Sequence, residues 1–110
     1  MEGEIKYKNK ITELDGIKFH SKKEAQRYFE LKQLNKINLI SDLKIQPKIP
    51  LIVNSTKIGY YIGDFHYYDK QTKKYILEDV KSKITKTPLY NLKKKILLTY
   101  KPPVVITEIF

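Results

Sequence analysis

The sequence predicts an α/β protein whose mixed central sheet is flanked by helices. Two segments have the apolar spacing and end signals of helices, one from Ser21 toward Asn38 and one from Thr87 to about Tyr100. Two other regions, residues 43–82 and 104–109, are rich in β-branched and aromatic residues, as strands are. Because these strand regions alternate with the helices, we expect the element order αβββαβ in a single layered core.

The composition fits one domain, with a basic arm at residues 1–10 and a core at residues 11–110. Hydrophobic residues make up 41% of the 110 residues, which suffices for a modest core. No apolar run resembles a signal sequence or a membrane span, so we expect a cytoplasmic protein without a membrane partner. Cysteine is absent and only two histidines occur, which argues against disulfides and a typical zinc site.

The formal net charge of +10 favours a polyanionic partner such as nucleic acid. Lysine supplies nearly all of the positive charge, since Arg27 is the only arginine, and a lysine-rich solvated surface would have the same composition. The arm contains Lys8 and Lys10 near its end, and both are candidate DNA contacts. A frayed terminus is an equally good interpretation of the arm.

The core begins with a turn and a helix. Asp15-Gly16 separates two short apolar segments and predicts a small hairpin. Ser21 is a suitable N-cap for the helix that follows. We expect the apolar face of this helix to contain Ala25, Tyr28, Phe29 and Leu31.

Glu24 has two interpretations that the spacing does not separate. Ser21 and Glu24 have the sequence of a capping box, in which the carboxylate bonds back to the start of the helix. Glu24 also lies on the edge of the apolar stripe, one turn before Tyr28, where an acid can point inward across the sheet.

Two short extended segments follow. Residues 39–42 form a connection, residues 43–46 form a strand that ends at Pro47, and residues 49–53 resume extended structure. A proline at each break indicates an edge strand or a bent strand, because proline cannot donate to the ladder.

The most informative stretch is a predicted hairpin over residues 60–82. Centring its polar turn places Asp64 directly opposite Asp79, and opposed like charges in a ladder are destabilising. Side chains alternate with period two, so Lys81 shares the face of Asp79 while Glu78 points to the other face. A divalent cation held by carboxylate oxygens, with a lysine beside it, explains this combination.

A helix and a strand complete the chain. Thr87 predicts an N-cap and Pro88 the first helical position. We expect Lys94 and Lys95 to face solvent and the inner stripe to contain Leu89, Leu92, Lys93, Ile96 and Tyr100. Residues 104–109 are nearly continuously apolar, which favours a strand in the interior of the sheet.

These fragments, in this order, resemble the restriction-endonuclease-like nucleases of the PD-(D/E)-x-K superfamily, and more closely a small phage-encoded branch of it. The matching fragments are residues 6–10, 15–19, 21–25, 41–43, 46–47, 64–65 and 78–81. The resemblance implies a restriction-endonuclease-like core with one site, which carries over to Glu24, Asp64, Asp79 and Lys81. Two positions depart from the motif. Gly63 stands where the motif has proline, and the (D/E) acid is Asp79 with Glu78 beside it, so the choice of metal ligand between these two stays open.

The resemblance further implies Mg²⁺- or Mn²⁺-dependent hydrolysis of DNA. Asp64, Asp79 and the Val80 carbonyl would hold the metal, Glu24 would bind a second metal or its waters, and Lys81 would orient the attacking water. Gln46 and Glu78 are candidates for a supporting role. Lysines that could follow the phosphate backbone are Lys22, Lys23, Lys83, Lys86, Lys93 and Lys94.

No recognition helix or zinc finger is evident, so we expect selectivity for DNA structure rather than sequence. Resolvases that cut Holliday junctions and other branched DNA during recombination in phage-infected bacteria are relatives by role, and they act as homodimers because a junction needs two cuts. The alternative is a non-catalytic nucleic-acid-binding or inhibitory protein with the same fold, whose mark would be a missing acid or lysine. A basic structural protein of an RNA–protein assembly would explain the charge but not the opposed acids.

Overall fold

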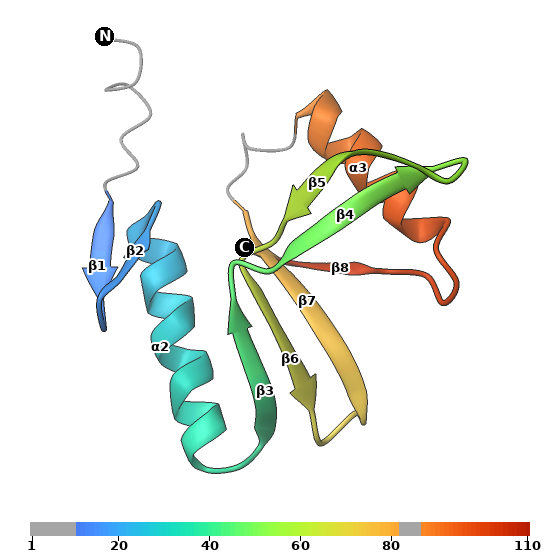
Figure 1. Cartoon of the computed structure of the whole chain (residues 1–110). Coiled ribbons are helices and arrows are strands. Elements are labelled where there is room, and N and C mark those ends of the chain that lie inside the picture. Colours follow the sequence, from blue (N-terminus) through green and yellow to red (C-terminus); the bar gives the residue numbers. More distant parts are fainter. Residues whose placement is uncertain (1–10, 82–86) are drawn as a thin grey trace, which may run out of the picture.

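The computed structural model describes residues 11–81 and 87–110 (Figure 1). Two helices and eight strands occur within these ranges. The predicted mixed α/β class is therefore confirmed. None of the helices in the described ranges is long and apolar enough to cross a membrane.

The N-terminal part is the predicted hairpin followed by the predicted helix. Strands β1 (Thr12–Leu14) and β2 (Ile17–Phe19) pair antiparallel across the Asp15-Gly16 turn, where both residues have positive φ. Helix α2 (Lys22–Lys36) begins at Ser21, whose side chain accepts a hydrogen bond from the Glu24 amide, as expected of an N-cap.

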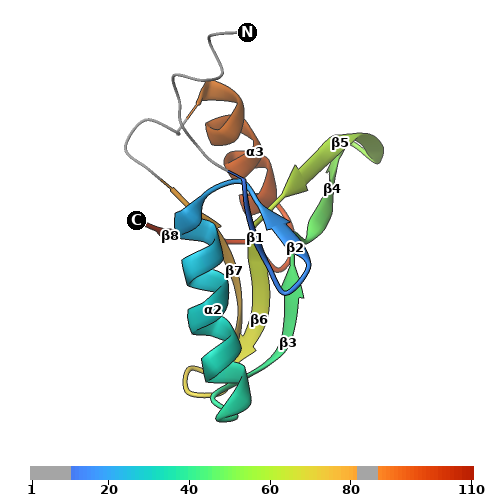
Figure 2. The same cartoon turned by 90° about the vertical axis from the view of Figure 1, so that its left-hand side faces the viewer.

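The largest sheet has four strands in the order β3-β6-β7-β8. Strands β3 (Ile40–Ile45), β6 (Phe65–Asp69) and β7 (Lys74–Val80) form an antiparallel meander. The chain then crosses through helix α3 (Pro88–Leu98) and returns as β8 (Ile106–Ile109), parallel to β7. The order of elements around this sheet is helix, three strands, helix, strand, with α2 lying along one face of the sheet (Figure 2).

A two-stranded ribbon is inserted into this plan. Strands β4 (Lys48–Val53) and β5 (Thr56–Ile62) pair only with each other within the described residues. The predicted hairpin over residues 60–82 is thus wrong in its first part, because the chain leaves one sheet after Ile62 and enters the other at Phe65. Five strands separate the helices where three are predicted.

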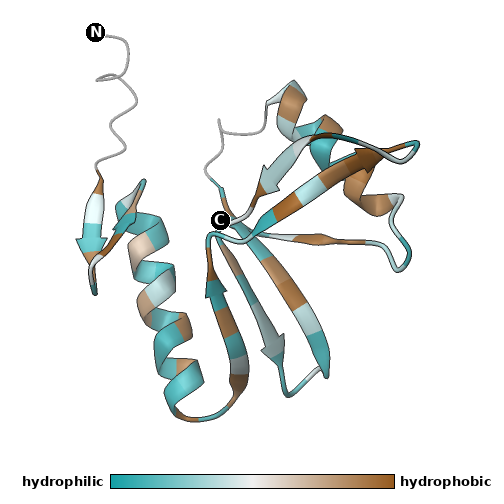
Figure 3. Cartoon of the chain, in the orientation of Figure 1, coloured by the Kyte–Doolittle hydropathy of each residue, from teal (hydrophilic) through white to brown (hydrophobic). Residues whose placement is uncertain are grey.

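Two apolar cores lie on opposite faces of β7. One packs α2 against β2, β3 and β6, and its buried members are Phe19, Ala25, Tyr28, Leu31, Ile40, Phe65 and Tyr67. The other packs α3 against β4, β5, β7 and β8, and its buried members are Leu51, Tyr61, Leu77, Tyr90, Leu97 and Ile106. Each fully buried large side chain contributes about 2 kcal/mol. Hydrophobic segments accordingly lie on β4 and β7, whereas α2 is mainly hydrophilic (Figure 3).

Some burial predictions are wrong. Phe29, Leu89 and Leu92 are 52%, 59% and 54% exposed, because Tyr28, Tyr90 and Leu97 occupy the inner faces of their helices instead. Lys94 is half-buried beside Glu108 rather than facing solvent.

Two strand predictions also need correction. The C-terminal strand lies at the edge of the sheet, not in its interior, and only Ile106 in it is buried. Residues 40–42, expected in a connection, belong to β3, which contains a bulge between Ser41 and Lys44.

Candidate functional site

The acidic residues singled out in the sequence lie where β7 ends, between the start of α2 and the β4–β5 ribbon. A recess of about 370 Å³ opens there, with Asp79 and Lys81 in its wall. Its remaining lining comes from β5 and from α3 with its N-cap: Tyr60, Tyr61, Ile62, Thr87, Leu89, Tyr90 and Lys93. The wall of the recess therefore combines apolar and aromatic side chains with the charged groups of Asp79, Lys81 and Lys93.

The register of the β6–β7 hairpin is the predicted one. Phe65 pairs with Glu78 and Tyr68 with Tyr75, and this ladder ends immediately before Asp64. The Asp64 amide donates to the Glu78 carbonyl at 3.0 Å, which keeps Asp64 beside the end of β7 although it lies outside a strand.

Asp79 and Lys81 form a buried ion pair, with 3.4 Å between Oδ1 and Nζ. These residues are 9% and 8% exposed. The Tyr61 hydroxyl donates to Asp79 Oδ2, and the Lys81 ammonium lies 3.5 Å from the centroid of the Tyr90 ring. Each member of the pair is thus fixed by a second contact, from β5 or from α3.

Asp64 is oriented by backbone groups on both sides. Its Oδ2 accepts a hydrogen bond from the Val80 amide at 2.6 Å, and its carbonyl accepts one from the Gln46 amide at 2.8 Å. Burial raises the pKa of Asp64 to about 8, against the lowering effect of the Val80 amide, and the nearby Glu24 and Asp79 carboxylates raise it further. The two acids therefore share one site and disfavour a second negative charge.

Glu24 contacts the start of α2 and also interacts electrostatically with Asp79. Its Oε1 accepts from the His20 amide at 3.3 Å, which is a helix-start contact one residue earlier than a capping box would make. Burial raises the pKa of Glu24, and the charge of Asp79 adds to that effect. The Glu24 carboxylate thus interacts electrostatically with Asp79 while it bonds to the backbone before α2.

Glu78 lies on the opposite face of β7, as the alternation predicts. It is 1% exposed and binds the Arg27 guanidinium through two contacts, Nε–Oε1 at 2.8 Å and Nη2–Oε2 at 2.6 Å. The Tyr67 hydroxyl also donates to Glu78. With both of its oxygens bound under α2, Glu78 does not face the recess, and its supporting role is to hold α2 to the sheet.

The lysines proposed as phosphate contacts differ in their surroundings. Lys22 and Lys23 are both exposed, and Lys23 donates to the Lys81 carbonyl at 3.0 Å. Lys93 donates to the Tyr60 carbonyl at 2.9 Å, and Lys94 contacts Glu108 at 3.2 Å. The other four, Lys8, Lys10, Lys83 and Lys86, lie outside the described residues.

Three residues that contact or support the Asp79–Lys81 pair were not predicted from the sequence: Tyr61, Tyr90 and Glu108. Tyr90 donates to Glu108 Oε2 at 2.7 Å, and this bond fixes the ring beside Lys81. Tyr61 reaches Asp79 only because the chain changes sheet at Gly63, which the strand pattern does not reveal. Burial raises the pKa of both tyrosines, so their hydroxyls remain protonated donors.

Gln46 acts mainly through its backbone. Its φ is 53°, its amide holds Asp64, and its side chain donates to the Lys18 carbonyl at 3.2 Å. Gln46 therefore connects the β1–β2 hairpin to the loop that carries Asp64.

Asp64 and Asp79 are a two-carboxylate donor pair of the kind that hard divalent cations prefer. Among residues 11–81 and 87–110, no three His, Asp or Glu side chains are grouped as a complete metal cage. The donor set fits a cation held by two carboxylates and completed by a backbone carbonyl or waters. The mutual repulsion that raises the pKa of Asp64 is what such a cation would relieve.

Residues 4–107 match the family described as "Protein of unknown function (DUF1064)", and the chain belongs to that family. No curated protein and no solved structure matches the chain.

Proposed function

We propose that this member of the DUF1064 family is a metal-dependent endonuclease that hydrolyses phosphodiester bonds in DNA. The observation that carries the proposal is the half-buried Asp64 beside the buried Asp79, with Lys81 held against Asp79 in the wall of a recess. A partly buried acid whose ionisation is opposed by neighbouring carboxylates is unfavourable for stability alone, and perturbed acids beside a lysine are typical of functional sites.

The topology supports the same proposal. The four-stranded sheet has three antiparallel strands, then a helix, then a strand parallel to the third, an order that supports the restriction-endonuclease-like core that the resemblance implies. The acids lie at the end of the second and third strands of that sheet, β6 and β7. Glu24 of the first helix is coupled to them, as the resemblance to that superfamily requires.

Mg²⁺ or Mn²⁺ would be held by Asp64, Asp79 and the Val80 carbonyl. The Glu24 carboxylate, which interacts electrostatically with Asp79, would bind the waters of this cation. Such a cation would polarise the scissile phosphate and lower the pKa of a bound water. The Val80 amide orients the Asp64 carboxylate, and the Tyr61 hydroxyl orients that of Asp79.

Lys81 is the cation that the chain itself contributes. Its ammonium is held between Asp79 and the Tyr90 ring, so little reorganisation is needed when a phosphate enters the recess. A preorganised ammonium next to the phosphate would stabilise the negative charge that develops there and would orient the attacking water.

The substrate would be bound through its backbone. The net charge of +10 and the exposed Lys22 at the start of α2 provide salt-sensitive affinity without base readout. We therefore propose selectivity for DNA structure, with branched DNA in phage DNA processing as the substrate and a homodimer as the form that makes paired cuts.

The proposal is tested by incubating the purified protein with linear, flapped and four-way DNA in Mg²⁺ or Mn²⁺, with and without EDTA. We expect the parent protein to cleave DNA only in the presence of the metal. We expect the Asp79→Asn and Lys81→Met variants to lose this cleavage. Asp42→Asn is the matched control, because Asp42 is an exposed acid of β3 whose positive φ asparagine also tolerates.

Metal-dependent cleavage that persists in both site variants would assign it to a contaminant or to another site. Binding without any cleavage by the folded parent would favour the non-catalytic nucleic-acid-binding alternative.

A further inference from the structure

The β4–β5 ribbon has a face that the apolar core does not use. Its inner face carries Leu51 and Tyr61, which are 3% and 4% exposed. Its outer face carries Lys48 and Ile62, which pair across the ribbon, and Tyr60, which pairs with Pro50. The ribbon extends away from the four-stranded sheet (Figure 1).

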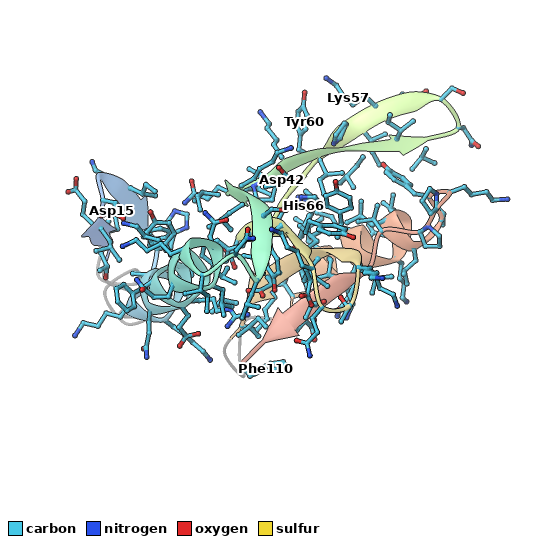
Figure 4. All side chains as sticks on the ribbon, turned by 90° about the horizontal axis from the view of Figure 1, so that it is seen from below. Asp15, Asp42, Lys57, Tyr60, His66 and Phe110 are labelled. Atoms are coloured by element: carbon cyan, nitrogen blue, oxygen red, sulfur yellow. The ribbon has the colours of Figure 1, made fainter. Side chains whose placement is uncertain are left out.

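The outer face is basic and apolar at once. No acid occurs from residue 43 to residue 63. Lys48 Nζ lies 4.2 Å and Lys57 Nζ 4.8 Å from the centroid of the Tyr60 ring, and Lys57 donates to the Tyr60 hydroxyl at 2.7 Å. Lys57 and Tyr60 project together from the ribbon (Figure 4). Neither lysine has an acidic partner among the described residues, so both ammonium groups can move to a ligand.

Exposed aliphatic groups surround this cluster. Ile62 is 60% exposed, Ile58 56% and Ile52 45%. Such side chains do not improve binding to phosphates, which lysines alone would provide. Together with an aromatic ring, these isoleucines form a surface that can contact the flat apolar faces of unpaired nucleobases.

We propose that the outer face of the β4–β5 ribbon binds unpaired nucleotides of the strand whose phosphate enters the recess. Tyr60 and Ile62 of this face also line the recess that contains Asp79 and Lys81, so one strand can contact both. Side-chain hydrogen bonds connect the ribbon to the recess as well, because Lys93 of α3 donates to the Tyr60 carbonyl and the Tyr61 hydroxyl donates to Asp79. The inference rests on the proposed function for the identity of the polyanion as DNA.

The charge of the face selects this occupant over a second copy of the chain. A symmetric contact through the ribbon would bring the unpaired lysines of two copies together, in a chain of net charge +10. A duplex is also a poor fit, because its stacked bases leave no free face for Tyr60. Binding by the ribbon would thus explain why the protein selects DNA by structure, and we expect DNA with single-stranded arms or flaps to be preferred.

The test is binding in EDTA, which needs no turnover. Fluorescein-labelled oligo-dT and a hairpin duplex of equal length are titrated with the parent, Tyr60→Ala and Tyr60→Phe, and anisotropy is measured. Tyr60→Ala should weaken binding of the single strand about tenfold and leave duplex binding nearly unchanged, while Tyr60→Phe keeps most of the affinity. A strand containing 2-aminopurine should show fluorescence quenching by the parent that Tyr60→Ala loses.

Tyr75→Ala is the matched control, since Tyr75 is a 62% exposed tyrosine near the other end of β7. Equal losses for single strand and duplex, or an equal effect of Tyr75→Ala, would overturn the inference. So would a dimer that sedimentation shows to dissociate in Tyr60→Ala, because the face would then join two copies. Metal-dependent cleavage with no Tyr60-dependent binding refutes the inference alone, whereas Tyr60-dependent binding without cleavage refutes the proposed function alone.

Discussion

Arg27 and Glu78 form a two-point ion pair between α2 and β7, with Nε–Oε1 at 2.8 Å and Nη2–Oε2 at 2.6 Å. The pair uses both carboxylate oxygens of Glu78 and the only arginine of the chain. Next to it in sequence, Asp79 points to the other face of the strand and contacts Lys81. Two adjacent acids thus have different tasks, one structural and one available for chemistry.

The first prediction concerns Glu78→Gln. Removing one partner of a buried ion pair leaves the other unpaired, so we expect a loss of about 3 kcal/mol in the free energy of unfolding. Urea denaturation measures it, and a double-mutant cycle with Arg27→Met should show that the two changes are not additive. At temperatures where the variant stays folded, metal-dependent cleavage should persist. A folded Glu78→Gln protein that no longer binds metal would make Glu78 the ligand in place of Asp79.

The second prediction separates the two site acids by their partners. Asp64 has no cationic partner among the described residues, so Asp64→Asn should raise the free energy of unfolding in EDTA above neutral pH, by at least about 1–2 kcal/mol, because each unit of the raised pKa corresponds to about 1.4 kcal/mol. Asp79→Asn should lower it by about 1–3 kcal/mol, because Lys81 then stays buried without its counterion. Both variants should lose cleavage and the stabilisation by Mg²⁺, which binds the folded protein only. Loss of stability in Asp64→Asn would contradict the repulsion inferred between the acids.

The third prediction is a pH dependence with a defined sign. The pKa of Asp64 rises from 3.8 to about 8 on folding, because burial disfavours the charged form. Its contribution to stability is therefore complete below the unfolded pKa and is lost as the pH rises through the folded value. In EDTA, the stability difference between Asp64→Asn and the parent should be near zero at about pH 4 and largest above about pH 8. A difference that is constant over this range would show that the carboxyl is not titrating there.

Much of the fold was predictable because its signals are local. The caps of both helices, the Asp15-Gly16 hairpin and the β6–β7 register follow from residues close in sequence. The ribbon was not predictable, because residues 56–62 and 65–69 are both strand-like and only Gly63 and Asp64 divide them. Which of the two sheets a strand joins is decided by its packing partners, here Tyr90 and Leu97 of α3.

The candidate site was predictable to the extent that period-two alternation holds. The alternation predicts that Asp79 and Lys81 share one face of the strand and that Glu78 lies on the other, and the structure agrees. It could not supply the tyrosines that fix this pair, because Tyr61 belongs to another sheet and Tyr90 to a helix reached after the strand ends.

The fourth prediction concerns Gly63, the residue before Asp64. A Cβ on Gly63 would lie 2.9 Å from Leu77 Cδ1 and 3.3 Å from the Tyr61 ring. The Gly63 amide donates a hydrogen bond to the Pro47 carbonyl at 3.0 Å. Gly63→Ala should therefore cost about 1–3 kcal/mol by overpacking, and Gly63→Pro should cost more because the amide donor is also lost. Thermal denaturation measures both. If Gly63→Pro were as stable as the parent, the loop before Asp64 would have a different packing from the one described.

The last prediction concerns how DNA is held. Since lysines rather than base-reading groups surround the site, the logarithm of the DNA affinity should fall linearly with the logarithm of the salt concentration, with a slope of about −0.9 for each phosphate neutralised. The affinity should depend little on the DNA sequence.

Lys22 is exposed at the start of α2, so Lys22→Ala should weaken DNA binding and reduce this slope by about one unit. Lys74→Ala is the control, because Lys74 is an exposed lysine at the opposite end of β7 from Asp79. Lys94→Ala should differ from both by losing stability as well, since Lys94 is paired with Glu108, which holds Tyr90. Anisotropy titrations from about 50 to 300 mM salt measure the slopes, and equal slopes for the Lys22 and Lys74 variants would show that the DNA does not run past the start of α2.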